Sequence, residues 1–303
     1  MKLRRLLENP YRVFSVLATQ GKFRWLPDAL FLRLMFRSQM GYWPNLNNPQ
    51  TFSEKLQWLK LHHRREAYSV MADKWRVRSY IADMLGEEYL IPLLGVWDTP
   101  EEIDFAALPS RFVLKCNHNS GLGMYICRDK AAMDVQRVKQ NLHRGLAEDY
   151  YGTVREWPYR DIPRKILCEQ FMTDRGNELK DFKIHCFNGK AKMILVCADR
   201  FAESGMTEDF YTETWEHLPV CRPKCPNCRI PHEKPAQLEQ MVQMAEKLAE
   251  GIPFLRVDFY ISDGRIYFGE LTFFPGSGIV PFQPESWDRT IGSWLRLPEK
   301  DKV

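Results

Sequence analysis

The sequence has no apolar run close to the roughly 18 residues that a membrane-spanning helix needs. The apolar stretch at residues 13–18 is shorter than the core of about 7–15 residues found in a secretory signal. There is also no internal repeat and no low-complexity tract. These absences argue against an integral membrane protein, a repeat protein and a disordered chain, and we expect a soluble protein of the cytoplasm.

The net charge is small but unevenly distributed. The 303 residues carry a formal net charge of only +4. Residues 1–80 hold 15 Lys or Arg and 5 Asp or Glu, a net charge of +10, which leaves −6 for residues 81–303. This asymmetry predicts an anionic partner at the N-terminal end, and we expect no nucleic-acid partner. A hydrophobic content of 45% is enough for a large core in one or two domains.

Residues 1–45 combine basic and large apolar side chains, interrupted by Pro10, Pro27 and Pro44. The pattern predicts two short amphipathic helices within a basic N-terminal segment, residues 1–70. Two interpretations stay open. Either the helices bind an anionic membrane surface, which would place the protein at the inner face of the cytoplasmic membrane, or they cap the core and leave their basic face in water.

Five of the eight cysteines lie in apolar, strand-like runs, where a thiol acts as a small hydrophobic side chain. A reducing cytosol therefore fits better than a disulfide scaffold. The other three follow the pattern His217-x3-Cys221-x3-Cys225-x2-Cys228-x3-His232 in a proline-rich loop. Cys221, Cys225, Cys228 and His232 could hold a structural Zn²⁺ ion. The alternative is a loop of reduced thiols, because no second CxxC is present.

Hydrophobic periodicity predicts a mixture of helices and strands, which is an α+β fold. The predicted helices cover residues 53–62, 66–85, 131–150 and 237–250. The predicted strands cover residues 89–96, 112–116, 124–127, 165–171, 181–187 and 191–198, followed by a closing hairpin at 254–272.

The closing hairpin carries the most informative pattern, because alternation places Arg256 and Asp258 on its polar face. A three-residue loop at 262–264 would put Arg256 opposite Glu270, with Asp258 diagonal to it on the same face. A two-residue turn would instead split the two carboxylates across the sheet. Paired hard oxygen ligands suit Mg²⁺ next to phosphates. A solvated hairpin face is the alternative.

A second informative segment is the strand at 112–116, in which Lys115 precedes a polar loop with Ser120, Gly121 and Gly123. Glycines let a phosphate approach the backbone, and the ammonium group adds a positive charge. The spacing differs from that of a P-loop and of a Rossmann turn. A flap over a nucleotide and an ordinary hairpin loop both fit this segment.

Two further strands carry polar residues that suit a nucleotide site. The strand at 165–171 ends in Glu-Gln-Phe, an edge that can pair its backbone with adenine and offer an acid to the ribose. Asp181, Lys183 and His185 share one face of the next strand. His185 and His118 could act as general bases, but neither has a nucleophile at hydrolase spacing, which argues against triad chemistry.

The order of these motifs resembles that of an ATP-grasp ligase. It runs Asp73-Lys74, Phe112-Val-Leu-Lys115, Glu169-Gln170-Phe171, Arg256-Val-Asp258, Glu270-Leu-Thr272 and Pro275-Gly276. Within that superfamily, the segments at 51–61, 72–78 and 115–121 resemble the TupA-like group, and the resemblance covers about residues 45–298.

The resemblance implies an ATP-grasp fold, in which two α+β subdomains enclose ATP. Residues 71–298 would form this domain, with a flap subdomain at about 111–170 and a metal-binding subdomain at about 171–298. The implied nucleotide contacts are Lys74, Lys115, Ser120, Gly121, Gly123, Glu169, Gln170, Phe171 and Asp181. The implied catalytic residues are Lys115, Lys183 and Arg256. The implied ligands of two Mg²⁺ ions are Asp258, Glu270 and Thr272, of which the last replaces the asparagine of many relatives.

The resemblance also implies a reaction in which ATP phosphorylates a carboxylate and an amine attacks the acyl phosphate to form an amide. The TupA-like group is tied to teichuronopeptide and other polysaccharide biosynthesis, including that of capsules and exopolysaccharides. The implied substrates are therefore a uronic-acid glycan or another carboxylate acceptor, and an amino acid or amine. A glycosyltransferase, a kinase and a non-catalytic polysaccharide-assembly scaffold are the alternatives, although no Asp-x-Asp motif supports sugar transfer.

Overall fold

The computed structural model describes residues 10–175, 179–198 and 205–299. The helices are α2 (Tyr11–Thr19), α3 (Asp28–Met40), α4 (Phe52–His62), α5 (Ala67–Ala72), α6 (Val77–Met84), α7 (Val135–Leu146), α8 (Tyr150–Val154), α9 (Leu238–Leu248) and α10 (Ser286–Trp294). Short 3-10 helices cover Glu87–Tyr89, Pro100–Glu102, Lys130–Ala132, Trp157–Tyr159 and Pro275–Gly278. None of the described helices has both the length and the apolar character needed to cross a membrane.

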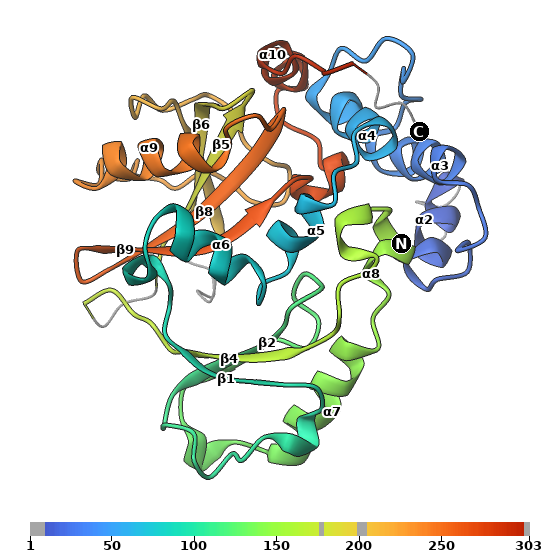
Figure 1. Ribbon diagram of the computed structural model, residues 1–303. Coiled ribbons are helices and arrows are strands. Elements are labelled where there is room, and N and C mark those ends of the chain that lie inside the picture. The colour runs from blue at the N-terminus through green and yellow to red at the C-terminus, as the bar shows by residue number, and fades with distance from the viewer. Residues whose placement is uncertain (1–9, 176–178, 199–204, 300–303) are drawn as a thin grey trace.

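Two antiparallel sheets form the centre of the molecule, one above the other in Figure 1. The smaller sheet has the order β1-β4-β2-β3, and the larger sheet has the order β7-β6-β5-β8-β9. The strands are β1 (Leu93–Trp97), β2 (Phe112–Cys116), β3 (Tyr125–Cys127), β4 (Ile166–Gln170), β5 (Asp181–Phe187), β6 (Lys190–Ala198), β7 (Thr207–Tyr211), β8 (Phe254–Ser262) and β9 (Arg265–Thr272). The predicted α+β class is confirmed, whereas β7 and α10 were missed in the sequence.

The smaller sheet has one apolar face and one polar face. Phe112 and Leu114 of β2 are buried, and Lys115 beside them is only half-buried. The apolar face packs against α7, whose Leu142 is fully buried, and together they form a small separate core. Lys115 therefore faces the larger sheet.

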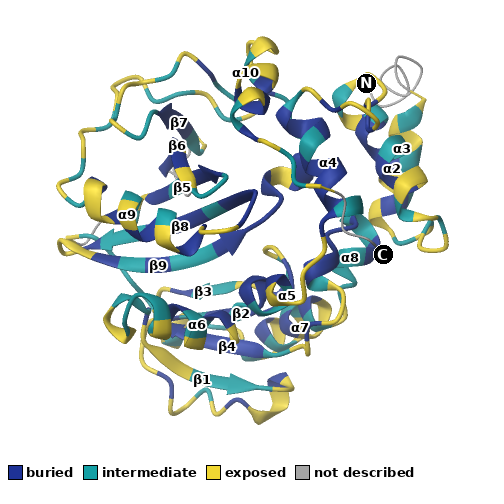
Figure 2. Ribbon diagram, turned by 45° about the horizontal axis from the view of Figure 1, so that its top comes forward, coloured by how far each residue is buried: buried dark blue, intermediate teal, exposed yellow. Residues whose placement is uncertain are grey.

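The main core lies around the larger sheet, whose strands β5, β6 and β8 are mostly buried (Figure 2). Helix α9 covers this sheet with Met241, Ala245 and Leu248, and the same core continues to α4 and α10. A capping box begins α4, since the Thr51 hydroxyl accepts the Glu54 N–H at 3.2 Å and the Glu54 carboxylate accepts the Thr51 N–H at 3.1 Å.

The predicted helix over residues 66–85 is wrong in its middle, where α5 ends and α6 begins. Asp73 between them is extended, with φ −76° and ψ 111°. Its carboxylate accepts the N–H of Trp75 at 2.9 Å and the side-chain amide of Asn117 at 2.8 Å. The side chain thus replaces a helical hydrogen bond and links this break to the loop after β2.

The closing hairpin has a shorter turn than expected. Ser262 pairs with Arg265, so the loop contains two residues, Asp263 with φ 50° and Gly264 with φ 79°. Two consecutive left-handed residues match the right-handed twist of the flanking strands, and Asp-Gly is a preferred sequence for such a turn.

A bulge in β9 compensates for the shorter turn. The register shifts after Asp258, and Gly269 is the extra residue. As a result Asp258 faces Glu270 directly, and Arg256 faces Thr272 rather than Glu270 as the sequence predicted. The two carboxylates still share one face of the sheet, although the turn alone would have separated them.

Helices α2 and α3 confirm the two predicted N-terminal helices, whereas residues 1–9 of the basic segment lie outside the described residues. They pack through a cluster that includes Phe31 and Met35. Arg155, only 2% exposed, holds them to the rest of the chain. Its guanidinium lies 3.1 Å from the Asp28 carboxylate and donates to the carbonyl of Phe23 at 3.1 Å.

Candidate active site

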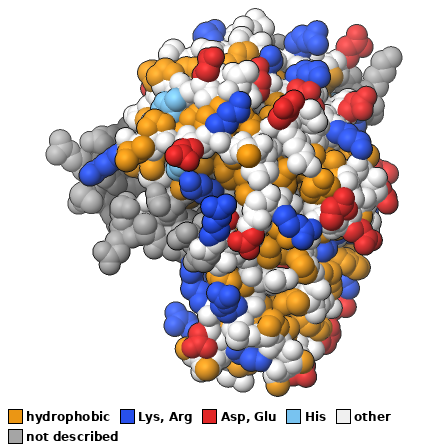
Figure 3. Space-filling view, turned by 90° about the vertical axis from the view of Figure 1, so that its left-hand side faces the viewer, with side chains coloured by type: hydrophobic (Ala, Val, Ile, Leu, Met, Phe, Trp, Pro, Cys, Tyr) orange, Lys and Arg blue, Asp and Glu red, His pale blue; other side chains and the backbone are white. Residues whose placement is uncertain are grey.

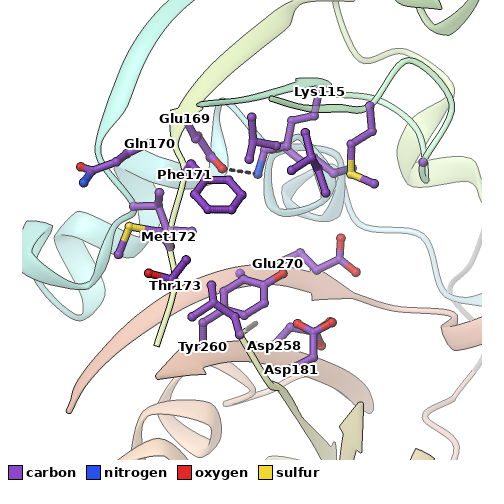
Figure 4. Close-up of a pocket in the computed structure, with 18 of the residues that line it drawn as sticks. Lys115, Glu169, Gln170, Phe171, Met172, Thr173, Asp181, Asp258, Tyr260 and Glu270 are labelled. Atoms are coloured by element: carbon purple, nitrogen blue, oxygen red, sulfur yellow. Dashed lines mark ion pairs between the residues drawn. The ribbon is translucent and has the colours of Figure 1, made fainter. Parts of the chain in front are cut away.

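A cavity of about 550 Å³ lies between the two sheets. Figure 4 shows Lys115, Glu169 and Phe171 on the side of the smaller sheet, facing Asp258 and Glu270 on the larger one. Polar side chains therefore meet across the cavity from two sheets that are built by different parts of the chain.

Three carboxylates and two cations line the wall formed by the larger sheet. The pairing of β5 with β8 places Lys183 beside Asp258, and the Lys183 ammonium lies 2.5 Å from the Asp258 carboxylate and 3.1 Å from that of Asp181. The Arg256 guanidinium joins the two neighbouring acids, at 2.6 Å from Asp258 and 2.7 Å from Glu270. The cluster holds one more negative than positive charge, and it concentrates hard oxygen atoms as Mg²⁺ requires.

The charges in this cluster set its protonation. Burial alone would raise the pKa of Glu270, but Arg256 and Lys74 outweigh burial and lower the pKa to about 2. Burial raises the pKa of Asp258, and the charges of Arg256 and Lys183 offset only part of that effect. Burial opposes the charge of Lys183, yet Asp258 raises the pKa of its ammonium above the ordinary value. Glu270 therefore stays ionised, and Lys183 stays charged.

Two further lysines line the cavity. The Lys115 ammonium is 2.6 Å from the Glu169 carboxylate, which also lies 3.5 Å from Arg78. Lys74 follows the break between α5 and α6, and its ammonium donates to the carbonyl of Asn119 at 2.5 Å. Burial lowers the pKa of Lys74. Both lysines line the cavity, where their charges could meet an anion such as a phosphate.

The loop after β2 contributes Ser120 and Gly121 to the cavity, and Gly121 has the left-handed φ of 93°. Gly123 is not among the lining residues and packs against Gly145 of α7 instead. The side-chain amide of Asn119 donates to the carbonyl of Gly145 at 3.2 Å. The loop is therefore held to α7 by two glycines in close contact and by one amide.

Replacing Gly145 by Ala should displace this loop. A Cβ atom there would lie 2.6 Å from the Gly123 Cα and 2.7 Å from the Cys116 sulfur. We expect a loss of about 1–3 kcal/mol in unfolding free energy from overpacking, together with weaker ATP binding measured by calorimetry. Arg144→Ala, at the exposed neighbouring position, is the control. Unchanged stability and unchanged ATP affinity in Gly145→Ala would contradict the close contact.

Sequence reasoning missed several residues of the cavity, among them Arg111 and Arg128. The two guanidinium groups lie 5.1 and 5.8 Å from the ring centre of Phe171. Each arginine borders the paired ends of β2 and β3, so the register of these strands brings them together. Only a correct pairing of the two short strands would have revealed this in the sequence.

The structure brings most of the predicted nucleotide, catalytic and metal residues to the cavity. Those that line it are Lys74, Lys115, Ser120, Gly121, Glu169, Gln170, Phe171, Asp181, Lys183, Arg256, Asp258 and Glu270. Thr272 is not among the lining residues, and its hydroxyl donates to the Glu270 carboxylate at 3.2 Å. Thr272 thus orients a ligand of the predicted metal site.

Neither histidine that was considered as a general base lines the cavity. His185 is buried beside Arg256, and burial lowers its pKa well below the ordinary value. His118 is also buried, with its Nε2 atom 3.2 Å from the carbonyl of Glu148. Both histidines are therefore packing residues.

The burial of His118 makes stability depend on pH. Burial lowers its pKa from 6.5 to about 4. Between pH of about 6.5 and 4 the unfolded chain binds a proton at His118 that the folded chain does not bind. The contribution of His118 to the unfolding free energy is therefore fully present above pH of about 6.5 and is lost as the pH falls towards 4. We expect His118→Gln to reduce the difference in unfolding free energy between pH 7 and pH 4.5, by at most about 3 kcal/mol. Urea unfolding at both pH values measures it, with exposed His143→Gln as the control, and equal pH dependence in all three proteins would refute it.

The predicted zinc residues are only partly brought together. Cys228 and His232 lie together, but their third neighbour is Asp209 of β7. Cys221 and Cys225 are not in this group. The backbone of Cys221 pairs with that of Gln283 instead.

A family model matches residues 54–296, and the class that it defines is ATP-grasp. Its description is TupA-like ATPgrasp, and the chain belongs to this family. The ATP-grasp fold expected from the order of motifs is thereby confirmed.

Among solved structures, the chain is similar to the D-alanine–D-alanine ligase of Bacillus anthracis in complex with ATP, at 18% identity and a TM-score of 0.39, over 67% of this chain and 55% of that one. The D-alanine–D-alanine ligase of Helicobacter pylori matches at 15% identity and a TM-score of 0.42, over 80% of this chain and 69% of that one. The N5-carboxyaminoimidazole ribonucleotide synthetase of Thermus thermophilus matches at 13% identity and a TM-score of 0.43, over 79% of this chain and 57% of that one. No curated protein matched the chain.

Proposed function

We propose that the protein is an ATP-dependent carboxylate–amine ligase that forms an amide through an acyl phosphate. The observation that carries this proposal is one cavity that brings Lys115 and Lys74 together with Asp258 and Glu270. Lysine ammonium groups suit the phosphates of ATP, and the paired carboxylates suit the metal ions that accompany them.

Each part of the cavity has a role in this proposal. Lys74 and Lys115 bind phosphate oxygens, the loop at 120–121 covers them, and the segment at 169–171 contacts the adenine. Asp258 and Glu270 would hold one or two Mg²⁺ ions, and Thr272 would orient the Glu270 carboxylate. Bound Mg²⁺ would neutralise charge on the phosphates. The carboxylate pair fits Mg²⁺ because Glu270 stays ionised and faces Asp258 directly.

The reaction would proceed in two displacements. A carboxylate oxygen of the acceptor attacks the γ-phosphorus of ATP, and the bond to ADP breaks. The nitrogen of the amine then attacks the acyl carbon, the bond to phosphate breaks, and the amine loses a proton. Arg256, which already bridges two carboxylates at 2.6 and 2.7 Å, would stabilise the negative charge that develops in both steps.

The proposed acceptor is a uronic-acid glycan or another carboxylate of polysaccharide or teichuronopeptide-type synthesis, and the proposed amine is an amino acid. The TupA-like family match supports this setting. The N-terminal segment, residues 1–70, is the proposed contact to anionic glycan or to the cytoplasmic membrane face. It exposes Trp25 at 76% and Val16 at 54% next to basic residues. On the face shown in Figure 3, acidic and basic side chains of the described residues are intermixed, which fits an anionic partner less well.

The test is to incubate the protein with ATP, Mg²⁺, uronic-acid glycans and amino acids, and to measure ADP release and product mass. ADP release should require the carboxylate, and the product mass should equal that of acceptor plus amine minus water. ATP binding without carboxylate-dependent ADP release across a broad panel would contradict the proposal. Sugar transfer from a nucleotide donor without ATP consumption would identify a glycosyltransferase instead.

A further inference from the structure

Away from the cavity, three side chains of different chemistry converge at the edge of the larger sheet. Asp209 lies in the edge strand β7, and Cys228 and His232 lie in the loop that follows. A carboxylate oxygen, the thiol sulfur and an imidazole nitrogen all lie within 4.8 Å of one another. Asp209 is completely buried, and the other two are partly buried. A buried carboxylate next to a thiol and an imidazole is a set of metal ligands.

Hydrogen bonds hold these side chains in place. The Cys228 N–H donates to Oδ2 of Asp209 at 3.0 Å. The His232 N–H donates to the hydroxyl of Tyr211 at 2.8 Å, and the indole N–H of Trp215 donates to the His232 carbonyl at 3.1 Å. The rings of Tyr211 and Trp215 are stacked at 4.4 Å. The loop is therefore built around the cluster, with its two potential ligands fixed through their own backbone.

The Asp209 carboxylate lies between two imidazoles. Its Oδ2 atom is 3.4 Å from Nε2 of His232, and its Oδ1 atom is 3.2 Å from Nε2 of His217. His217 contacts the other oxygen of this carboxylate and is not a member of the group of three.

We propose that Asp209, Cys228 and His232 bind a structural Zn²⁺ ion. Zinc accepts sulfur, nitrogen and oxygen ligands together, whereas the cavity between the sheets offers Mg²⁺ only hard oxygen atoms. Bonds of about 2.0–2.3 Å separate tetrahedral ligands by about 3–4 Å, so the three grouped atoms reach this geometry with small rotations. This inference does not depend on the proposed ligase reaction.

Such an ion would fasten the loop at 212–232 to the larger sheet. Arg222 of this loop lies 3.5 Å from Glu208 of β7 and stacks over the ring of Phe282 at 4.9 Å. Phe282 belongs to the segment that continues from β9, which carries Glu270. Bound zinc would thus stabilise the β7 edge of the larger sheet, next to the segment that follows β9.

The proposed set of zinc ligands differs from the set that sequence spacing predicted. Both sets contain Cys228 and His232, but only the sequence-derived set contains Cys221 and Cys225, which are absent from the observed group. Cys221→Ser and Cys225→Ser are therefore matched controls for Cys228→Ser, since each removes one sulfur atom from the same loop.

The experiment measures zinc in the full-length protein, purified and dialysed in excess Mg²⁺ so that the cavity does not retain zinc. We expect about one zinc per chain in the wild type, Cys221→Ser and Cys225→Ser, and at least a tenfold weaker affinity for added Zn²⁺ in Cys228→Ser and His232→Gln. Titration of the zinc-free wild type with Co²⁺ should give a thiolate-to-metal charge-transfer band that Cys228→Ser lacks.

The results decide the proposal in either direction. Far-ultraviolet circular dichroism and ATP binding show whether each variant is folded. If Cys228→Ser does not fold, the Co²⁺ charge-transfer band of the wild type still tests whether a thiolate binds the metal. A wild type that binds neither Zn²⁺ nor Co²⁺ outside the cavity would overturn the site. Loss of zinc from Cys221→Ser or Cys225→Ser to the same extent as from Cys228→Ser would also overturn it, in favour of the ligands expected from spacing.

Discussion

Glu270→Gln should reduce ATP turnover by at least about 1,000-fold while the protein stays folded, because an amide replaces a proposed Mg²⁺ ligand without a change of shape. Glu270 faces Asp258 directly, and its pKa of about 2 keeps it ionised throughout the working pH range. Asp258→Asn should have an effect of similar size. Steady-state ADP release at saturating Mg²⁺ measures both.

Glu250→Gln removes an exposed carboxylate outside the cavity and is the control for this prediction. Its turnover should match that of the wild type. Thermal unfolding distinguishes a catalytic loss from a folding defect. Turnover within tenfold of the wild type in both Glu270→Gln and Asp258→Asn would remove the metal assignment, and the proposed reaction with it.

Lys115→Met should weaken ATP binding by about 10- to 100-fold, the effect of losing one charge-assisted hydrogen bond to a phosphate. Lys115 lies on the face of β2 that lines the cavity, and the variant keeps most of the length of the side chain. Isothermal titration with ATP and Mg²⁺ measures the change directly, before any acceptor is known.

The pair with Glu169 needs its own comparison, because Lys115 also neutralises that carboxylate at 2.6 Å. Lys115→Met should weaken ATP binding more than Glu169→Gln does, whereas a purely structural ion pair would make the two variants equally weak. Lys190→Met removes an exposed lysine of β6 and should bind ATP as the wild type does. Normal affinity in Lys115→Met would contradict its contact with phosphates.

Most strands and many residues of the cavity were predicted from the sequence, because alternation and motif order depend mainly on neighbouring residues. Asp181 and Lys183 share a face in β5 as alternation predicted, and the register pairs them with β8. The break at Asp73 was missed because its carboxylate accepts the N–H of Trp75 and is held by the side-chain amide of Asn117, 44 residues away. Helical periodicity contains no signal for such a contact.

The hairpin shows a different limit. The two-residue turn alone would have placed Asp258 and Glu270 on opposite faces. The bulge at Gly269 in β9 shifts the register so that both carboxylates lie on the same face. Asp209 escaped notice for a related reason: β7 is short and was not recognised as a strand, so spacing along the loop suggested Cys221 and Cys225 as ligands. Ligands from a distant strand are visible only once the sheet is assembled.

The separate core of the smaller sheet has a consequence for how the molecule melts. Phe112, Leu114 and Leu142 belong to a cluster distinct from the one that supports β5, β6 and β8. A unit with so few apolar contacts should open at a lower temperature than the remainder, giving two steps in calorimetry. A nucleotide that contacts both sheets would couple the unfolding of their two cores. Saturation with ATP should therefore merge the two calorimetric steps into one.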